Sequence, residues 1–336
     1  MIDRRTLVGA LASGTLASPF AAGAQPRDKV WRIGYIGLLP AGASPEGDKF
    51  LDANFLQVLS EHGFVVGKNL VFERRGAAGR YDQLAATVTE LIGLHVDVLV
   101  ALATPATRAA KAATTTIPIV MLNVSDPVER GLLASLARPG GNVTGMADFG
   151  TELLPKRLEL LKAAAPRIAR VAQVMEDDGR FVDAATASAT NERYDAAARG
   201  LGMSLVRVRL NSPQDFESAT AMIVQERADA LLIDGSSTNY ALRRELGEFS
   251  VRHRLPSVVS TNASDAGGLI YYGTDQTEVF RKAAIYVVKI LNGARPTDLA
   301  VEQPTKFELI FNLKIAKAIG LTIPQAFLLR ADRVIE

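Results

Sequence analysis

The sequence predicts an α/β fold of two similar halves, each with a parallel sheet covered by helices. Short β-rich runs alternate with helical patterns along the chain, and several of these runs are apolar without alternation. The same rhythm begins again after the turn PGGNVTG at 139–145. Strands that are covered by helices on both faces need apolar side chains on both faces, which favours parallel sheets.

The first half contains four expected strands and the helical patterns between them. The third and fourth strands are the most apolar, so we expect them at the centre of the sheet. The expected strands are WRIGYIGLL (31–39), NLVFERR (69–75), VDVLVALAT (96–104) and IPIVMLNV (117–124), and the expected helices lie near 46–62 and 80–94, with a short one before the fourth strand.

The second half repeats this alternation without a convincing residue-level repeat, so the duplication is one of architecture. The expected strands are RVAQVM (170–175), MSLVRVRL (203–210), ADALLIDG (228–235) and LPSVVST (255–261), and the expected helices lie near 151–165, 182–199, 213–226 and 238–252. After Gly267 come a strand, GLIYYG, and the helical pattern TEVFRKAAIYVVKILNG. From Val301 to Glu336 we expect a final strand and two short helices.

The composition is that of a globular protein with about two domains, since 48% of the 336 residues are hydrophobic and 22% are charged. The net charge is only +2, and lysine and arginine form no runs. A nucleic-acid partner is therefore not expected. The absence of cysteine excludes disulfides, thiolate metal sites, a cysteine nucleophile and a lipid-modified cysteine.

The first 24 residues predict an exported protein. The pair Arg4-Arg5 precedes an apolar run, and Ala22-Gly23-Ala24 fits a signal-peptidase site, so we expect cleavage after Ala24 and a periplasmic location. The apolar run is shorter than the ~20 residues that a membrane-spanning helix needs, so we expect no stable membrane insertion. We favour the general secretory route, with the twin-arginine route as the alternative.

Polar residues follow the strands at the ends where an open parallel sheet binds ligands. Asn123, Ser125 and Asp126 follow the fourth strand, although Asp126 with Pro127 could instead begin a helix as its N-cap. Other strands also end in short polar groups. These are Thr104, Pro105 and Ala106 after the third strand, Asp234, Ser236 and Ser237 in the second half, and Thr261 with Asn262 after the last strand of that half.

Together these residues could hold a zwitterion. A helix N-terminus behind Thr104 suits a carboxylate, because its free N–H groups point towards an anion. Asp126 and Asp234 suit an ammonium group. Taken singly, each of these residues is more often a cap or a turn residue.

The sequence contains none of the common motifs of catalytic or nucleotide-binding sites. There is no G-x-S-x-G, P-loop, G-x-G-x-x-G or H-E-x-x-H, so we expect neither an enzyme nor a cofactor. His62, His95 and His253 are interpreted as surface or helix-end residues. The run Glu176-Asp177-Asp178 could suggest a divalent cation, but adjacent loop carboxylates are more often solvated, and no metal is expected.

Several stretches resemble substrate-binding proteins of ABC importers, of the tryptophan/tyrosine type, over essentially the whole chain after the signal. They are R-I-G-x-x-G, ATPAT, IPIVMLNVSDPVERGLLASLARPGGNVTG, RHRLPSVVS, GGLIYYGTD, QPTKFELIFNLKIAKAIGL and ADRVIE. The resemblance implies a periplasmic-binding-protein type I fold, in which three crossings join two Rossmann-like lobes. It also implies permease and ATPase subunits as partners.

Applied to this sequence, the resemblance implies a first lobe of 27–148 plus 266–297 and a second lobe of 149–265 plus 298–336. It adds Leu38, Pro40 and Tyr272 to the ligand-binding loops. Where many members have Asn-Pro, this chain has Glu176-Asp177, which leaves the identity of the ligand open. The alternatives are a periplasmic sensing protein with the same fold and an exported α/β enzyme.

Overall fold

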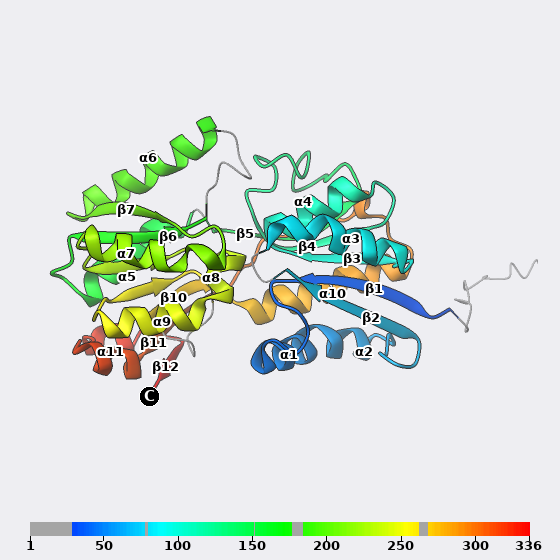
Figure 1. Ribbon diagram of the computed structural model, residues 1–336. Coiled ribbons are helices and arrows are strands. Elements are labelled where there is room, and N and C mark those ends of the chain that lie inside the picture. The colour runs from blue at the N-terminus through cyan, green and yellow to red at the C-terminus, as the bar shows by residue number, and fades with distance from the viewer. Residues whose placement is uncertain (1–28, 78–79, 151, 177–183, 262–267) are drawn as a thin grey trace, which may run out of the picture.

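The computed structural model describes residues 29–336, apart from 78–79, 151, 177–183 and 262–267. Two sheets lie side by side, each with helices packed on both faces (Figure 1). The predicted α/β fold of two lobes with parallel sheets is therefore confirmed. The expected signal segment lies outside the described residues.

The first lobe is built on a five-stranded sheet in the order β2-β1-β3-β4-β5, in which all neighbours are parallel. Its strands are β1 (Trp31–Gly37), β2 (Leu70–Gly76), β3 (Val98–Leu102), β4 (Ile119–Ser125) and β5 (Val143–Asp148). Every residue of β3 is buried, as expected for a central strand that is covered on both faces.

The second lobe is built on a seven-stranded sheet in the order β12-β11-β10-β9-β8-β6-β7. Only the pair β10 and β11 is antiparallel. Its strands are β6 (Arg170–Met175), β7 (Ser204–Arg209), β8 (Ala230–Ile233), β9 (Ser257–Val259), β10 (Ile270–Thr274), β11 (Phe307–Asn312) and β12 (Arg333–Ile335).

Helices cover both faces of the first sheet. One face carries α1 (Pro45–Leu51), the π-helical segment η1 (Asp52–Leu56), α2 (Gln57–Glu61) and α10 (Gln276–Leu291), and the other carries the 3₁₀ turn η2 (Tyr81–Gln83), α3 (Leu84–Gly93) and α4 (Ala103–Ala113). Asp275 caps the start of α10 by accepting hydrogen bonds from the backbone of Thr277 and Glu278. Each large apolar side chain that α10 buries contributes about 1.5–3 kcal/mol to folding.

The second sheet is covered in the same way. One face carries α5 (Leu154–Ala164), α6 (Ala184–Gly200), α11 (Leu313–Ile319) and α12 (Gln325–Leu328), and the other carries α7 (Phe216–Gln225) and α9 (Arg243–Arg252). The short helix α8 (Ser237–Ala241) follows β8 on the side of the first lobe (Figure 1). The 3₁₀ turns η4 (Pro213–Asp215) and η6 (Pro296–Asp298) complete the fold.

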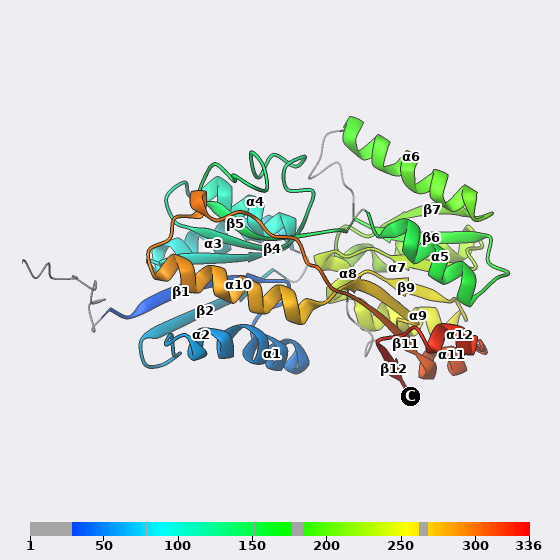
Figure 2. The same ribbon diagram turned by 180° about the vertical axis from the view of Figure 1, so that it is seen from behind.

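Three segments cross between the lobes, and they correct the expected boundaries. β10 pairs with β9 and β11 in the second sheet, so residues 270–274 do not belong to the first lobe. The chain then crosses into α10, which packs on the first lobe. Residues 299–302 still contact β5, because Thr144 Oγ1 donates to the Leu299 carbonyl at 2.8 Å. Figure 2 shows this segment (orange) running back past the first lobe before it enters β11.

Three further expectations differ from the structure. The helix expected near 46–62 is divided by η1. No helix begins after Asp126, where a turn follows instead. The C-terminal region contains two strands rather than one, because β12 adds an edge strand beside β11. Among the described residues, no helix has both the length and the apolar character that a membrane crossing requires.

Candidate functional site

The carboxyl ends of the parallel strands of both lobes point towards the middle of the molecule (Figure 1). Contacts join the two lobes there. The Tyr81 hydroxyl of the first lobe donates to Glu176, which follows β6. Arg243 of the second lobe donates to Ser44 Oγ at 3.4 Å. The polar residues after the strands therefore form two facing rims.

Residues with strained backbone angles lie on the first rim. Six described residues other than glycine have a positive φ angle. Three of them, His95, Arg227 and Arg254, directly follow helix ends, where this conformation is common. The other three lie at the carboxyl ends of β3 and β4. They are Ala103 (φ 72°), Asn123 (φ 52°) and Asp126 (φ 50°). Strain of this kind clusters at binding sites, where it aims particular groups.

Thr104 lies in the first turn of α4, directly after Ala103. It is not an N-cap, because Leu102 occupies the cap position and makes no capping bond. Its side chain is 9% exposed, and within the described part of the chain its hydroxyl has no hydrogen-bond partner. Pro105 and Ala106 complete the turn. The N-terminus of α4 therefore offers free backbone N–H groups beside a free hydroxyl.

The residues at the end of β4 are held by other segments. Asn123 Nδ2 donates to Gln276 Oε1 at 2.7 Å, while Asn123 Oδ1 is buried and without a partner. A side chain on Gly150 would collide with Ser125 Oγ, so the first crossing lies against Ser125. The Asp126 carbonyl accepts from Arg130 N at 2.9 Å in a single turn. The alternative of Asp126 as a helix N-cap is therefore wrong.

Two carboxyl groups lie near each other beside this turn. Asp148, at the end of β5, pairs with Ser125 in the sheet and accepts from Phe149 N at 2.8 Å. Burial raises the pKa of Asp148, the hydrogen bond from Phe149 N and the positive charge of Arg157 oppose that rise, and the negative charge of Asp126 adds a smaller rise. A cation placed beside Asp126 would be attracted by both groups.

On the second rim, the predicted residues follow β8 and β9. Asp234 Oδ2 accepts from Gln173 Nε2 at 2.7 Å, so this carboxylate is already engaged within its own lobe. Ser236 caps α8 by accepting from Asn239 N at 3.0 Å. Ser237 is buried in the first turn of that helix. Asn262 lies outside the described residues.

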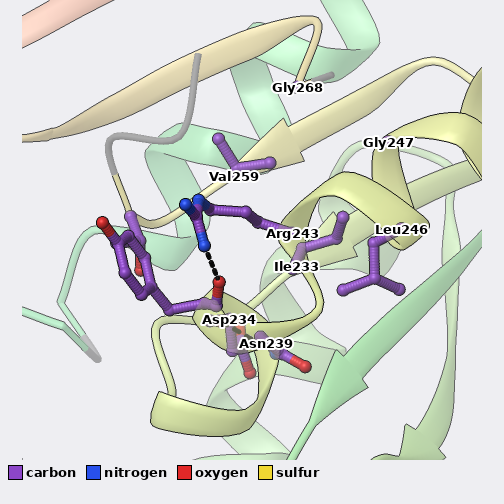
Figure 3. A pocket seen from close by; sticks show the side chains of 10 residues that line it. Ile233, Asp234, Asn239, Arg243, Leu246, Gly247, Val259 and Gly268 are labelled. Atoms are coloured by element: carbon purple, nitrogen blue, oxygen red, sulfur yellow. Dashed lines mark hydrogen bonds between the residues drawn. The ribbon is translucent and has the colours of Figure 1, made fainter. Parts of the chain in front are cut away.

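A small cavity of about 20 Å³ opens beside these strand ends (Figure 3). Its lining includes Thr261, and Figure 3 shows the side chains of Asp234, Val259 and Arg243 around it. The dashed bond in that view joins Arg243 Nη1 to the Tyr240 carbonyl at 2.9 Å. A cavity of this size holds about one water molecule.

The structure places the other predicted residues as follows. Leu38 and Pro40 lie in the loop after β1, which packs so closely over the end of β2 that a Cβ on Gly76 would strike Leu39. Tyr272 lies in β10 near the crossings, where its ring stacks on Phe307 at a centroid distance of 6.3 Å. The Tyr272 carbonyl accepts from the buried Arg157 at 2.8 Å.

The sequence predicted no role for Glu176, because its loop was interpreted as solvated. It is partly buried on the second rim, where it accepts from the Tyr81 hydroxyl and from Thr238 N at 3.2 Å. Burial raises the pKa of Glu176, and the bonds from Tyr81 and Thr238 oppose that rise. Asp177 and Asp178 lie outside the described residues. Among the residues that are described, no group of three or more His, Asp or Glu is arranged to hold a metal ion.

Similarity to known proteins identifies the family of this chain. A family model described as "ABC transporter substrate binding protein" matches residues 49–335. The chain belongs to this family. The tyrosine-binding protein of Clostridioides difficile (strain R20291) is 25% identical over 291 residues, which cover 85% of this chain and 81% of that protein. The relatives of the ABC substrate-binding family are binding proteins rather than enzymes.

Solved structures of similar proteins have the same fold. A conserved domain protein from Vibrio cholerae is 28% identical with a TM-score of 0.79, over 91% of this chain and 100% of that one. A Streptococcus pneumoniae protein, solved in complex with L-Trp, is 24% identical with a TM-score of 0.79, over 91% of this chain and 99% of that one. The ABC substrate-binding chain described here thus has the periplasmic-binding-protein type I fold.

Proposed function

We propose that this chain captures a small zwitterion of the aromatic amino-acid type between its two rims, in the periplasm, and delivers it to the permease of an ABC importer. The family supports the delivery role. The ligand class is supported by two relatives, one named as a tyrosine-binding protein and one solved with L-Trp.

The observation that carries this proposal is the strained rim of the first lobe. Ala103, Asn123 and Asp126 all hold positive φ angles at the carboxyl ends of two neighbouring strands, and Ala103 is also the first residue of α4. Ala103 turns the chain so that α4 begins with Thr104 on the rim. The ligand carboxylate would bind the Thr104 hydroxyl and the free N–H groups of this turn.

The ligand ammonium group would bind beside Asp126. Its carboxylate lies near that of Asp148 and repels it, although the positive charge of Arg157 already acts on Asp148 and lowers its pKa. An ammonium group would relieve that repulsion. Asp234 on the second rim is the alternative partner, and one of its oxygens accepts a hydrogen bond from Gln173.

Binding would act through the movement of the lobes and would break no bond. A ligand held by the first rim gains further contacts when the second rim closes on it, so it shifts the population towards the closed form that a permease recognises. ATP hydrolysis would belong to the partner subunits. A sensing protein would use the same closure to dock a receptor, which is the alternative role.

The proposal is tested by titrating the chain, purified from Gln25 onward, with L-tryptophan, L-tyrosine and L-phenylalanine in a calorimeter. We expect saturable binding of at least one of them, and a higher melting temperature in its presence, because such a ligand binds only the folded state. Titration with L-leucine, L-lysine and D-ribose is the control. Binding confined to the control ligands would contradict the proposed ligand class.

A further inference from the structure

The two lobes share a short feature, a tyrosine followed two residues later by glycine near the end of a strand. Tyr35 and Gly37 lie in β1, and Tyr271 and Gly273 lie in β10. A Cβ on Gly37 would stand 2.8 Å from Tyr35 Cε1, and a Cβ on Gly273 would stand 2.6 Å from the Tyr271 hydroxyl. Each glycine therefore leaves room for the ring to lean along its strand towards the carboxyl end.

The two tyrosines differ in what their hydroxyl groups contact. The Tyr271 hydroxyl donates to the Thr274 carbonyl at 2.8 Å. The Tyr35 hydroxyl has no hydrogen-bond partner among the described residues, although Tyr35 is only 3% exposed. The hydroxyl oxygen is not one of the buried atoms that lack a partner, so it reaches solvent and is free to meet a ligand.

A second unsatisfied donor lies beside Tyr35. Arg74 is paired with Tyr35 in the register of β1 and β2. Its Nη1 forms an ion pair with Asp48, which fixes the guanidinium group, while its Nε is buried without a partner. Burial raises the pKa of the Tyr35 phenol, so it keeps its proton and stays a donor. Both groups therefore offer a hydrogen to an oxygen acceptor.

The second lobe covers this pair of donors. The Tyr240 hydroxyl lies 3.7 Å from the position that a Cβ on Gly47 would take, so it touches the start of α1. The Arg243 guanidinium stacks over the Tyr240 ring at 4.4 Å and donates to Ser44. An oxygen held by Tyr35 and Arg74 would thus be enclosed when the lobes meet.

We infer that the Tyr35 hydroxyl and Arg74 Nε form a subsite for an oxygen on the far end of the ligand, the ring hydroxyl of a 4-hydroxyphenyl side chain. The inference rests on the proposed binding of aromatic amino acids and adds that L-tyrosine is the one selected. Thr104 and Asp126 would hold the groups that all amino acids share. Tyr35 and Arg74 would hold the group that distinguishes tyrosine from phenylalanine.

The test compares the affinities for L-tyrosine and L-phenylalanine by calorimetry in the wild type, Tyr35→Phe and the matched control Tyr271→Phe. We expect the wild type to prefer tyrosine by about tenfold or more, because phenylalanine leaves both donors unpaired. Tyr35→Phe should reduce this preference to about threefold or less without weakening phenylalanine binding. Tyr271→Phe removes a hydroxyl that already has a partner and should keep the wild-type preference.

A second variant, Arg74→Lys, keeps the charge opposite Asp48 but removes the Nε donor. It should also lower the tyrosine preference, with a melting temperature close to that of the wild type. Equal losses for both amino acids in Tyr35→Phe, or an unchanged preference, would overturn the subsite while leaving the proposed function in place. If the wild type bound neither amino acid nor tryptophan, the proposed function itself would fail, and the subsite with it.

Discussion

Thr104 is a buried residue at the start of α4, and its hydroxyl has no hydrogen-bond partner in the described chain. Thr104→Val removes it at nearly constant volume. The affinity for the aromatic amino acid should fall by about 1–3 kcal/mol, because a donor to a charged carboxylate is lost. Thr104→Ser keeps the hydroxyl and should bind nearly as the wild type does. Calorimetry measures both, and equal affinities for all three proteins would reduce Thr104 to a structural residue.

Asp126 allows a test of the ammonium contact. Asn tolerates a positive φ angle as well as Asp does, so Asp126→Asn should fold normally. It should bind L-tyrosine more weakly by a few kcal/mol, since a charge pair is lost. The amine-free analogue 3-(4-hydroxyphenyl)propionate should bind the variant and the wild type similarly. A parallel loss for both compounds would contradict the assignment.

Glu176 makes stability depend on pH. Its pKa in the folded chain is raised by burial, so it retains its proton where the unfolded chain, with a glutamate pKa of about 4.3, has lost it. Its contribution to stability is therefore greatest below about pH 4 and declines as the pH rises towards the folded pKa. In urea titrations, Glu176→Gln should gain stability relative to the wild type between about pH 4 and pH 7. A difference that does not change with pH would contradict this.

The candidate site could be predicted only in part from single residues. Thr104, Asn123 and Asp126 could be placed on one rim from the sequence, because polar residues after apolar strands meet at one edge of a parallel sheet; their role in binding stays a prediction. Tyr35 and Glu176 were not found. The orientation of Tyr35 depends on the space left by Gly37, and the burial of Glu176 depends on Tyr81 from the other lobe. Both depend on tertiary contacts that no local pattern records.

At the scale of elements, α10 is the clearest helix of the sequence, and it begins directly after the crossing from β10 into the first lobe. Its N-cap Asp275 accepts from Thr277 N at 2.8 Å. Asp275→Ala should lower the free energy of unfolding by about 1 kcal/mol, whereas Asp275→Asn should change it by a few tenths. Denaturant titrations check both values. Equal stability of the alanine variant and the wild type would show that tertiary packing alone fixes the start of α10.

Elements were easier to predict than their pairing. The apolar runs located most strands of both sheets, because burial on both faces produces an uninterrupted apolar run. The strand β5 was not predicted, since it begins within the expected turn at 139–145, and only one of the strands β11 and β12 was expected. The same pattern does not tell which sheet a strand joins, and β10 was therefore placed in the wrong lobe. The alternative that a helix begins at Asp126 was wrong for a local reason. Its positive φ angle bends the chain into a turn, although Asp-Pro is a common helix start.

At the scale of the whole molecule, a hydrogen bond between the two rims joins Tyr81 of the first lobe to Glu176 of the second. Tyr81→Phe removes that bond and should shift the ligand-free chain towards a more open form. Small-angle X-ray scattering should then report a larger radius of gyration without ligand, and a return to the wild-type value with saturating ligand. Identical scattering of variant and wild type without ligand would contradict this role.

The three crossings also determine when each lobe can finish folding during synthesis. One face of the first lobe has only α1, η1 and α2 as cover until α10 is made, and the second sheet is incomplete until β11 and β12 are made. Since chains grow from the N-terminus, neither lobe is complete until about residue 291, and the second needs almost the last residue. A chain that cannot fold early stays unfolded while it is being made, which is the state that a narrow translocation channel requires.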